Sequence, residues 1–277
     1  MTNNYLQNFL TISKSTLFFN LRKFKRRKNF NAKKTDEIKK HLNNLRAHGY
    51  SIVENFLSKE ECASMIKSID HAFEVYPEAT WTGLKSADRR IFGAEHLGGL
   101  FNEFFKNDFM HQVGSQYFRG LLGNLQTLAG RIDAVEGNIG SGEGWHRDGN
   151  NFQFKSLVYL SDANPENGPF QLIRNSHRLS QILKDSYVLN LQNPLGTRFT
   201  DGQINTLLAN DPDRLITLSA PAGTMVLVDV SAIHRGSPVE VGRRYAMFNY
   251  YYPSYDLTGR LEKFLPRLTP EMVIANI

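Results

Sequence analysis

From about residue 125 onward, short apolar runs alternate with clusters of Gly, Asn, Asp and Pro. This alternation limits the fold of the chain more than any other feature. The apolar runs occupy residues 157–160, 170–173, 224–228 and 245–251. Closely spaced strands separated by turn-forming residues are typical of an all-β sandwich or barrel. We therefore predict a β-rich half over residues 125–255, interrupted by a long, polar and partly helical insertion at residues 180–215.

The part of the chain before residue 125 is predicted to be mainly helical. Apolar residues at helical spacing indicate a helix over residues 35–46, with Thr35 as its N-cap and Gly49 at its end. Ser58 and Glu61 form the capping-box pattern of a second helix that runs to about residue 76. Residues 50–56 between them alternate like a strand. Further helices are expected around residues 101–105 and 109–122, so the fold class is mainly β with flanking α-helices.

Several classes of protein are disfavoured by simple features of the chain. Cys62 is the single cysteine, which excludes an intramolecular disulfide and a cysteine-based zinc site. No apolar run approaches the roughly 18–20 residues that cross a bilayer. The N-terminus lacks the pattern of a secretory signal peptide. We therefore expect a protein of the cytoplasm, a reducing compartment.

The positive charge of the chain is concentrated at its N-terminus. Residues 1–34 contain nine basic residues and no acidic residue, whereas residues 35–277 contain 24 basic and 27 acidic residues. A nucleic-acid enzyme is expected to carry its basic patch on the folded body. We therefore expect no nucleic-acid partner, and we interpret residues 1–34 as an extension of a single domain formed by residues 35–277.

This N-terminal extension has two interpretations. Apolar residues recur at roughly helical spacing between Tyr5 and Leu21, and a basic run follows at residues 22–28. An apolar helical stripe followed by basic residues can dock on an anionic membrane surface. The alternative is a terminal helix that packs on the body and is followed by a solvated charge run. The sequence leaves both open.

Three residues suggest a metal centre. His146 and Asp148 are separated by one residue, and His234 follows 86 residues after Asp148. In extended backbone, residues two apart point to the same side, so His146 and Asp148 can aim at one point. Two imidazoles and one carboxylate are the ligand set of the facial triad that binds non-haem Fe(II). The alternative for His146 and Asp148 is a surface hydrogen-bonded pair.

An arginine near the second histidine suggests a carboxylate cosubstrate. Arg244 lies ten residues after His234, beyond a turn that contains Gly236 and Pro238. In an antiparallel pair joined by that turn, residues 234 and 244 would lie close together. A buried guanidinium binds a carboxylate through two hydrogen bonds, which suggests a keto acid such as 2-oxoglutarate. Arg243 lies on the opposite face of the predicted strand and is the competing candidate.

Four segments together resemble the phytanoyl-CoA dioxygenase family of Fe(II)- and 2-oxoglutarate-dependent oxygenases. They are residues 49–58, the Trp-His-Arg-Asp at 145–148, residues 166–178 with Asn-Gly-Pro and Ser-His, and residues 222–244. The resemblance covers roughly three quarters of the chain. It implies a double-stranded β-helix, a jelly-roll barrel of the cupin type, with N-terminal helices packed on it. One departure is Arg235, which precedes Gly236-Ser237 where family members often read His-Gly-Ser.

The resemblance also implies roles for individual residues. His146, Asp148 and His234 would hold the iron and act as the catalytic centre, and Arg244, Ser237 and Tyr159 would bind 2-oxoglutarate. The implied reaction uses O2, releases succinate and CO2, and hydroxylates a C–H bond of a small molecule. From the residues themselves, Arg89 and Arg90 are candidates for binding an anionic substrate group, and Asn150 and Gln153 for polar substrate contacts. A solvated basic loop is the alternative for the two arginines.

Two other functions remain open. One is a cupin-like regulatory protein that binds a metal or ligand without turnover, which the intact triad and Arg244 disfavour. The other is a peripheral membrane oxygenase that acts on a lipid or glycolipid and is recruited through residues 1–34.

Overall fold

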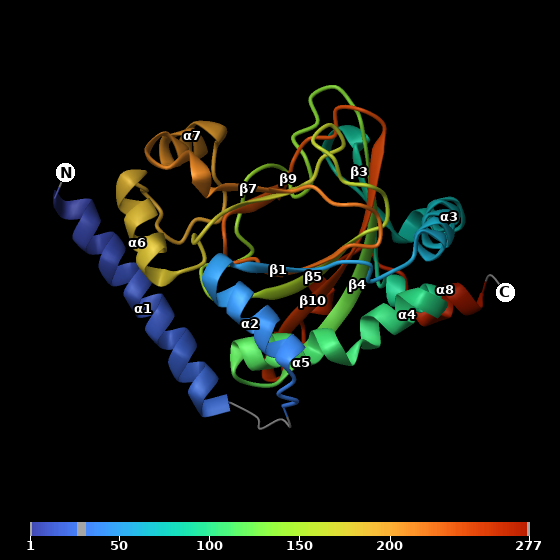
Figure 1. Cartoon of the computed structure of the whole chain (residues 1–277), viewed down its shortest axis with the longest axis horizontal. Helices are drawn as coiled ribbons and strands as arrows, with labels where there is room; N and C mark the ends of the chain where they lie inside the picture. Colours follow the sequence, from blue (N-terminus) through green and yellow to red (C-terminus); the bar gives the residue numbers. More distant parts are fainter. Residues whose placement is uncertain (1, 27–31, 276–277) are drawn as a thin grey trace.

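Two antiparallel sheets form the centre of the molecule in the computed structural model, which describes residues 2–26 and 32–275 (Figure 1). The larger sheet has the order β1-β8-β5-β10-β4-β3-β2, and the smaller sheet has the order β7-β6-β9. The larger sheet contains β1 (Tyr50–Val53), β2 (Thr80–Thr82), β3 (Asp88–Phe92), β4 (Leu122–Asp133), β5 (Phe154–Tyr159), β8 (Met225–Asp229) and β10 (Arg243–Pro253). The smaller sheet contains β6 (Phe170–Ile173), β7 (Leu215–Leu218) and β9 (His234–Gly236).

The larger sheet is buried on both faces. On one face, alternate residues such as Leu157 and Val226 pack against Phe170 and Leu172 of the smaller sheet. The other face packs against the helices α2 (Asp36–His48), α3 (Lys59–Val75), α4 (Gly99–Lys106) and α5 (Asp108–Phe118). The larger sheet therefore lies between the smaller sheet on one face and a layer of helices on the other.

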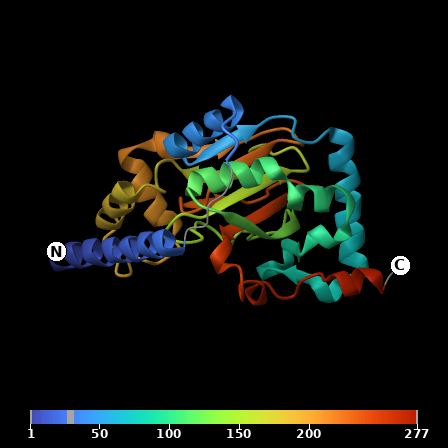
Figure 2. The same ribbon diagram turned by 90° about the horizontal axis from the view of Figure 1, so that it is seen from below.

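The remaining helices lie around the smaller sheet and the chain ends. Helices α6 (Leu179–Val188) and α7 (Asp201–Asn210) lie beside the smaller sheet, α1 (Thr2–Arg26) runs along α6, and α8 (Pro270–Ile274) lies near the C-terminus (Figures 1 and 2). None of the helices in the described ranges is long and apolar enough to cross a membrane.

Local signals in the N-terminal half are confirmed. The Thr35 hydroxyl accepts a hydrogen bond from the backbone N–H of Ile38, and Gly49 ends α2 in a left-handed conformation with φ of 87°. Ser58 and Glu61 make the reciprocal hydrogen bonds of a capping box at the start of α3. These caps depend only on neighbouring residues, so the sequence alone predicts them well.

The predicted fold class needs correction in two respects. The described chain is mixed α/β rather than mainly β, because eight α-helices accompany the ten strands. Hydrogen bonding joins the described strands into two sheets and does not close them into one barrel. Strands β1, β2 and β3 come from the segment expected to be mainly helical and extend both edges of the larger sheet. The division into an extension and one domain stays a prediction.

Helix α1 packs on the body through one stripe of side chains. Ile12 is only 1 % exposed, and the Asn8 side-chain amide donates a hydrogen bond of 2.8 Å to the carbonyl oxygen of Leu191. The Phe19 and Phe118 rings meet edge to face with centroids 6.3 Å apart. This is the packing that the second interpretation expected. Of the basic run, Arg27 and Lys28 lie outside the described residues.

Candidate metal centre and its cavities

A short backbone bridge brings the two histidines of the predicted triad together. The N–H of His146 donates to the carbonyl oxygen of His234 at 2.9 Å, and the N–H of His234 donates to that of His146 at 2.8 Å. Residues paired in this way carry their side chains on the same face of the ladder. The two imidazole centroids lie 4.3 Å apart as a result.

The tautomer of each imidazole is set by the main chain. Nδ1 of His146 lies 2.9 Å from the carbonyl oxygen of Gly144, and Nδ1 of His234 lies 2.9 Å from that of Ala232. Because a carbonyl oxygen only accepts, each Nδ1 carries the proton and each Nε2 keeps a free lone pair. Burial and the neighbouring imidazole lower the pKa of His234 to about 3, so its ring is neutral at pH 7.

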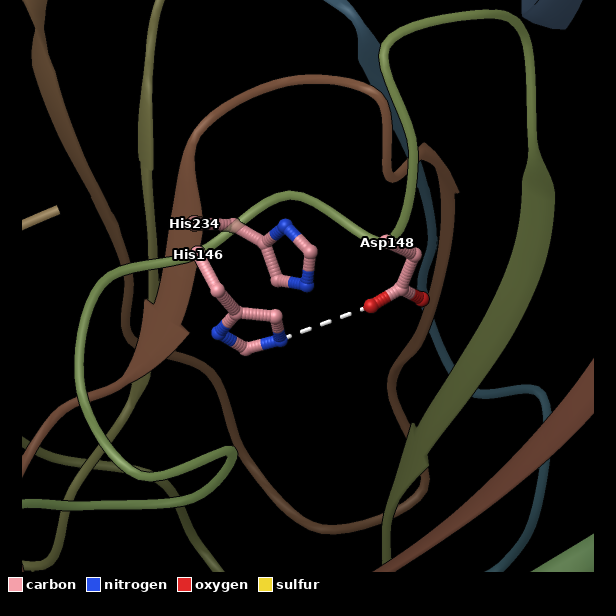
Figure 3. A group of neighbouring side chains, drawn as sticks. All are labelled: His146, Asp148 and His234. Carbon is pink, nitrogen blue, oxygen red and sulfur yellow. Dashed lines mark ion pairs between the residues drawn. The ribbon is translucent and has the colours of Figure 1, made fainter. Parts of the chain in front are cut away.

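Asp148 completes the group. Its Oδ1 lies 3.5 Å from Nε2 of His146, and one ligand atom from each of the three residues lies within 4.8 Å of the others. Figure 3 shows both rings and the carboxylate turned toward a common space. The intervening Arg147 points the opposite way and donates to the carbonyl oxygens of Ser176 and Ser231. This is the alternation predicted for extended backbone.

The donor set fits a divalent metal ion. It consists of two unprotonated imidazole nitrogens and one ionised carboxylate, which is the ligand combination of mononuclear Fe(II) sites with open coordination positions. No other cluster of metal-ligating side chains is present in residues 2–26 and 32–275. His177, the histidine of the Ser-His pair in residues 166–178, lies outside the cluster.

Sequence reasoning missed Lys155, which adjoins the metal centre. Its ammonium group forms an ion pair with Asp148 and lies 4.0 Å from the centre of the Tyr250 ring. Burial raises the pKa of a carboxyl, but the Lys155 ammonium outweighs burial and holds the pKa of Asp148 well below its usual range. The available signal was a lysine within the largely apolar strand β5. Because a lysine is rarely buried without an acidic partner, its position indicated a nearby carboxylate.

Arg244 lies in the cavity that contains the two imidazoles. This cavity lies between the sheets and is lined by His146, His234, Lys155 and Arg244 among other residues. Arg244 is 3 % exposed, and none of the ion pairs between described residues involves its guanidinium. Because burial lowers its pKa, the charged guanidinium favours an anionic ligand. The competitor Arg243 is exposed and pairs with Asp133 at 3.4 Å.

The route by which Arg244 approaches the centre differs from the predicted hairpin. Strand β9 belongs to the smaller sheet and pairs with β6, whereas β10 belongs to the larger sheet and pairs with β4 and β5. His234 and Arg244 therefore approach each other across the gap between the two sheets instead of along a hairpin. Glycine permits this approach, because a Cβ atom on Gly236 would lie 2.7 Å from Nη2 of Arg244.

Ser237 and Tyr159 both make hydrogen bonds to the main chain. The Ser237 hydroxyl donates to the carbonyl oxygen of Pro169 at 3.0 Å. The Tyr159 hydroxyl donates to the carbonyl oxygen of Leu218 at 2.9 Å and accepts from the N–H of Phe170 at 2.8 Å. Tyr159 lines the cavity, whereas Ser237 is buried and is not among the residues that line it.

The two arginines proposed for the substrate lie on opposite faces of β3. Arg90 lines the same cavity as Arg244 and forms an ion pair with Asp88. Arg89 faces away, and its guanidinium carbon lies 4.4 Å from the centre of the Phe73 ring on α3. Strand alternation separates the pair, so only Arg90 is near the metal centre.

Asn150 and Gln153 line a second cavity, and Asp148 is also part of its wall. This cavity has a volume of about 210 Å³. Its wall combines the loop after the metal motif, aromatic residues near the end of β10, and Phe19 and Arg22 of α1. Arg22 forms an ion pair of 2.8 Å with Asp256, which closes one side. The contribution of α1 was not predicted, because no local pattern links residues so far apart in the chain.

Comparison with known protein families gives one match that covers well over half of the chain. The model of the family described as "Phytanoyl-CoA dioxygenase (PhyH)" matches residues 45–243. The matched segment contains all three candidate metal ligands but ends one residue before Arg244 and excludes α1. A comparison with curated proteins found no match.

Solved structures of low sequence identity share the fold. The epimerase SnoN, solved with Fe3+, alpha ketoglutarate and nogalamycin RO, is 14 % identical over 79 % of this chain and 84 % of its own, with a TM-score of 0.59. HygX from Streptomyces hygroscopicus, solved with nickel, 2-oxoglutarate and hygromycin B, is 15 % identical over 80 % and 88 %, with a TM-score of 0.56. EctD from S. alaskensis with bound Fe is 15 % identical over 80 % of each chain, with a TM-score of 0.60.

Proposed function

The chain belongs to the phytanoyl-CoA dioxygenase family of Fe(II)- and 2-oxoglutarate-dependent oxygenases, and from this premise we propose that it hydroxylates a C–H bond of a small molecule. His146, Asp148 and His234 would hold the iron. The observation that carries the proposal is the pair of carbonyl-fixed imidazoles that present unprotonated Nε2 atoms beside an ionised carboxylate. Iron and 2-oxoglutarate would supply the oxidising chemistry with O2, releasing succinate and CO2.

Arg244 would hold the distal carboxylate of 2-oxoglutarate. The support for this role is its buried guanidinium, which lines the cavity of the two imidazoles and has no acidic side chain as an ion-pair partner among the described residues. A charge-assisted fork of this kind fixes both the position and the orientation of a carboxylate. Ser237 and Tyr159 would shape the cosubstrate end of the cavity, because their hydroxyl groups hold the backbone of β6 and its flanks in place.

The second cavity would bind the substrate. It adjoins Asp148 but lies apart from Arg244, so both molecules would reach the metal from different sides. Its aromatic rings and the side chains of Asn150 and Gln153 favour a substrate with both apolar surface and hydrogen-bonding groups. Arg90 would contribute positive charge on the cosubstrate side, and the position of Arg89 gives it no role at the site. The two facing sheets would be this chain's form of the double-stranded β-helix of the family, without hydrogen-bonded closure into one barrel.

Formation of succinate from 2-oxoglutarate under Fe(II) and O2 tests the proposal. The intact chain is expected to form succinate slowly even without a substrate. His146→Ala and Asp148→Ala should abolish it, because each removes a metal ligand. His71→Ala, which removes an exposed histidine on α3, is the matched control and should behave like the intact chain.

The succinate assay also distinguishes the enzyme from the alternative, a cupin-like regulatory protein without turnover. A regulatory protein of cupin type would bind Fe(II) and lose that binding in His234→Ala, yet it would form no succinate with any candidate substrate. Undiminished Fe(II) binding by a variant that carries both Asp148→Ala and His234→Ala would refute the metal-site assignment itself.

A further inference from the structure

The outer face of α1 carries an unusual concentration of exposed apolar side chains. Fifteen large apolar residues are exposed in the described chain, and seven of them belong to this one helix. They are Leu6, Phe9, Leu10, Leu17, Phe18, Leu21 and Phe24, with exposed fractions between 40 % and 82 %. Contiguous exposed apolar surface of this kind marks an interaction site more often than isolated exposed residues do.

The exposed residues form a stripe opposite the packed face. Leu10, Leu17, Leu21 and Phe24 recur at intervals of seven, four and three residues and therefore share one side of the helix. The opposite side is held by buried Ile12 and by the contacts of Asn8 and Phe19 with the body. The outer stripe cannot turn inward without breaking these contacts, so it stays exposed while α1 is packed on the body.

The charge of α1 indicates what that partner is. The helix contains five basic residues and no acidic one: Lys14, Arg22, Lys23, Lys25 and Arg26. An anionic bilayer surface attracts each such residue by about 1 kcal/mol in general. Two copies of the same helix would instead bring ten positive charges together, which disfavours self-association through this face.

We propose that the outer stripe of α1 docks on the surface of an anionic lipid bilayer, with the helix lying in the membrane interface. Leucine and phenylalanine side chains would enter the boundary between head groups and acyl chains, and Lys14 and Lys25, which neighbour the stripe, would meet the lipid phosphates. The body of the chain, with its excess of acidic residues, would face away from the membrane. This inference does not depend on the proposed enzymatic activity.

Flotation of the full chain with vesicles tests the inference. Vesicles of phosphatidylcholine containing about one-third phosphatidylserine should carry the protein upward at low salt, and high salt should weaken the binding. A variant with Leu10→Gln, Leu17→Gln and Phe24→Gln should bind at least tenfold more weakly. Its matched control replaces three exposed apolar residues elsewhere, Val135→Gln, Ile139→Gln and Val241→Gln, and should bind like the intact chain.

Further variants separate the contributions and guard against misfolding. Lys14→Gln, Lys25→Gln and Arg26→Gln together should weaken binding to the anionic vesicles and remove most of its salt dependence. All substituted residues are exposed, so circular dichroism and thermal unfolding should match those of the intact chain. Failure of the full chain to float with anionic vesicles at low salt would overturn the inference. Sedimentation showing a dimer that the leucine and phenylalanine substitutions dissociate would assign the face to a second copy instead.

Discussion

Two main-chain carbonyl groups determine how the imidazoles of His146 and His234 present their nitrogen atoms. The carbonyl oxygens of Gly144 and Ala232 each hold an Nδ1 proton, and each lies two residues before its histidine. Many metal sites use a carboxylate for this purpose. Because carbonyl oxygens orient both histidines here, neither needs a buried carboxylate as a partner. Asp148 is then the one anionic member of the ligand set.

The depressed pKa of His234 predicts a pH dependence of stability in the metal-free protein. The folded chain keeps His234 neutral down to about pH 3, whereas the unfolded chain protonates it below about pH 6.5. Protons therefore favour unfolding across this window, and the free energy of unfolding should fall by about 1.4 kcal/mol per pH unit as the pH decreases. Urea unfolding at a series of pH values measures this dependence. In His234→Gln, the free energy of unfolding should fall less steeply with decreasing pH, by about 1.4 kcal/mol per pH unit. An unchanged pH dependence would contradict the assignment.

The ion pair between Lys155 and Asp148 predicts a metal-dependent effect on stability. Lys155→Met leaves a buried carboxylate without its cation, which should cost the metal-free protein about 3 kcal/mol. A bound divalent ion takes over that charge, so Mn(II) or Fe(II) should stabilise the variant more than the intact chain. Thermal unfolding with and without metal measures this.

The matched control for Lys155→Met adds Asp148→Asn. The second substitution removes the carboxylate charge and should recover part of the lost stability without metal. Equal losses with and without metal would show that Lys155 acts only through packing.

At the level of single residues, the sequence predicts the three candidate metal ligands that the structure brings together, but not their neighbours. His146, Asp148 and His234 stand in patterns that carry their own chemistry. Lys155 does not, because its importance arises from a contact with Asp148 that only tertiary packing creates. Arg89 and Arg90 were treated as a pair, and only the pleat of β3 distinguishes them.

Among the structural elements, the short strand β9 has the greatest effect on the site. It contributes His234 to the metal centre and Gly236 to the neighbourhood of Arg244, although it is three residues long. Its partner is β6 in the smaller sheet, and β10 approaches from the larger sheet. The turn residues between β9 and β10 favoured a hairpin, but packing of the two sheets decided the pairing. The turn residues therefore predicted correctly that Arg244 lies near β9, but they predicted the wrong strand pairing.

The glycine of β9 predicts a specific effect on cosubstrate binding. In Gly236→Ala, the new Cβ would lie 2.7 Å from both Nη2 of Arg244 and Cβ of Ser141, so the guanidinium must move. The apparent affinity for 2-oxoglutarate should fall about tenfold or more, because a charge-assisted hydrogen bond is lost or distorted. Titration of 2-oxoglutarate at saturating Fe(II) measures this.

The control for this substitution is Gly202→Ala on α7. The nearest atom to a Cβ there is 3.9 Å away, and alanine favours a helix, so cosubstrate binding should stay unchanged. Fe(II) affinity should remain near that of the intact chain in both variants. A loss of Fe(II) affinity in Gly236→Ala as large as the loss for 2-oxoglutarate would indicate a general collapse of β9.

In the whole molecule, α1 connects regions that are distant in the sequence. Asn8 bonds to the segment after α6, Asn151 of the metal-motif loop donates to the Ser15 hydroxyl at 3.3 Å, and Arg22 pairs with Asp256 near the C-terminus. The sequence predicted a helix here but left its position open between membrane and body. Its amphipathic pattern could not reveal which of its two faces would pack on the body.

The packed face of α1 predicts a difference in stability between its two sides. Ile12→Ala removes a side chain that is 1 % exposed, which should lower the free energy of unfolding by about 2 kcal/mol or more. Leu10→Ala on the outer face should change it by no more than about 0.5 kcal/mol. Urea unfolding of both variants compares them, and equal effects would show that α1 is not firmly packed.

The wall that Phe19 and Arg22 give to the second cavity has a practical consequence for the search for a substrate. A shortened protein that starts at residue 35, after α1 and before α2, would keep every candidate metal ligand and Arg244. It would still convert 2-oxoglutarate to succinate without a substrate. The second cavity, however, would lack the part of its wall that α1 provides when candidate substrates are screened. Negative screening results with such a protein would reflect the missing helix, so substrate discovery should use the chain with its N-terminal residues intact.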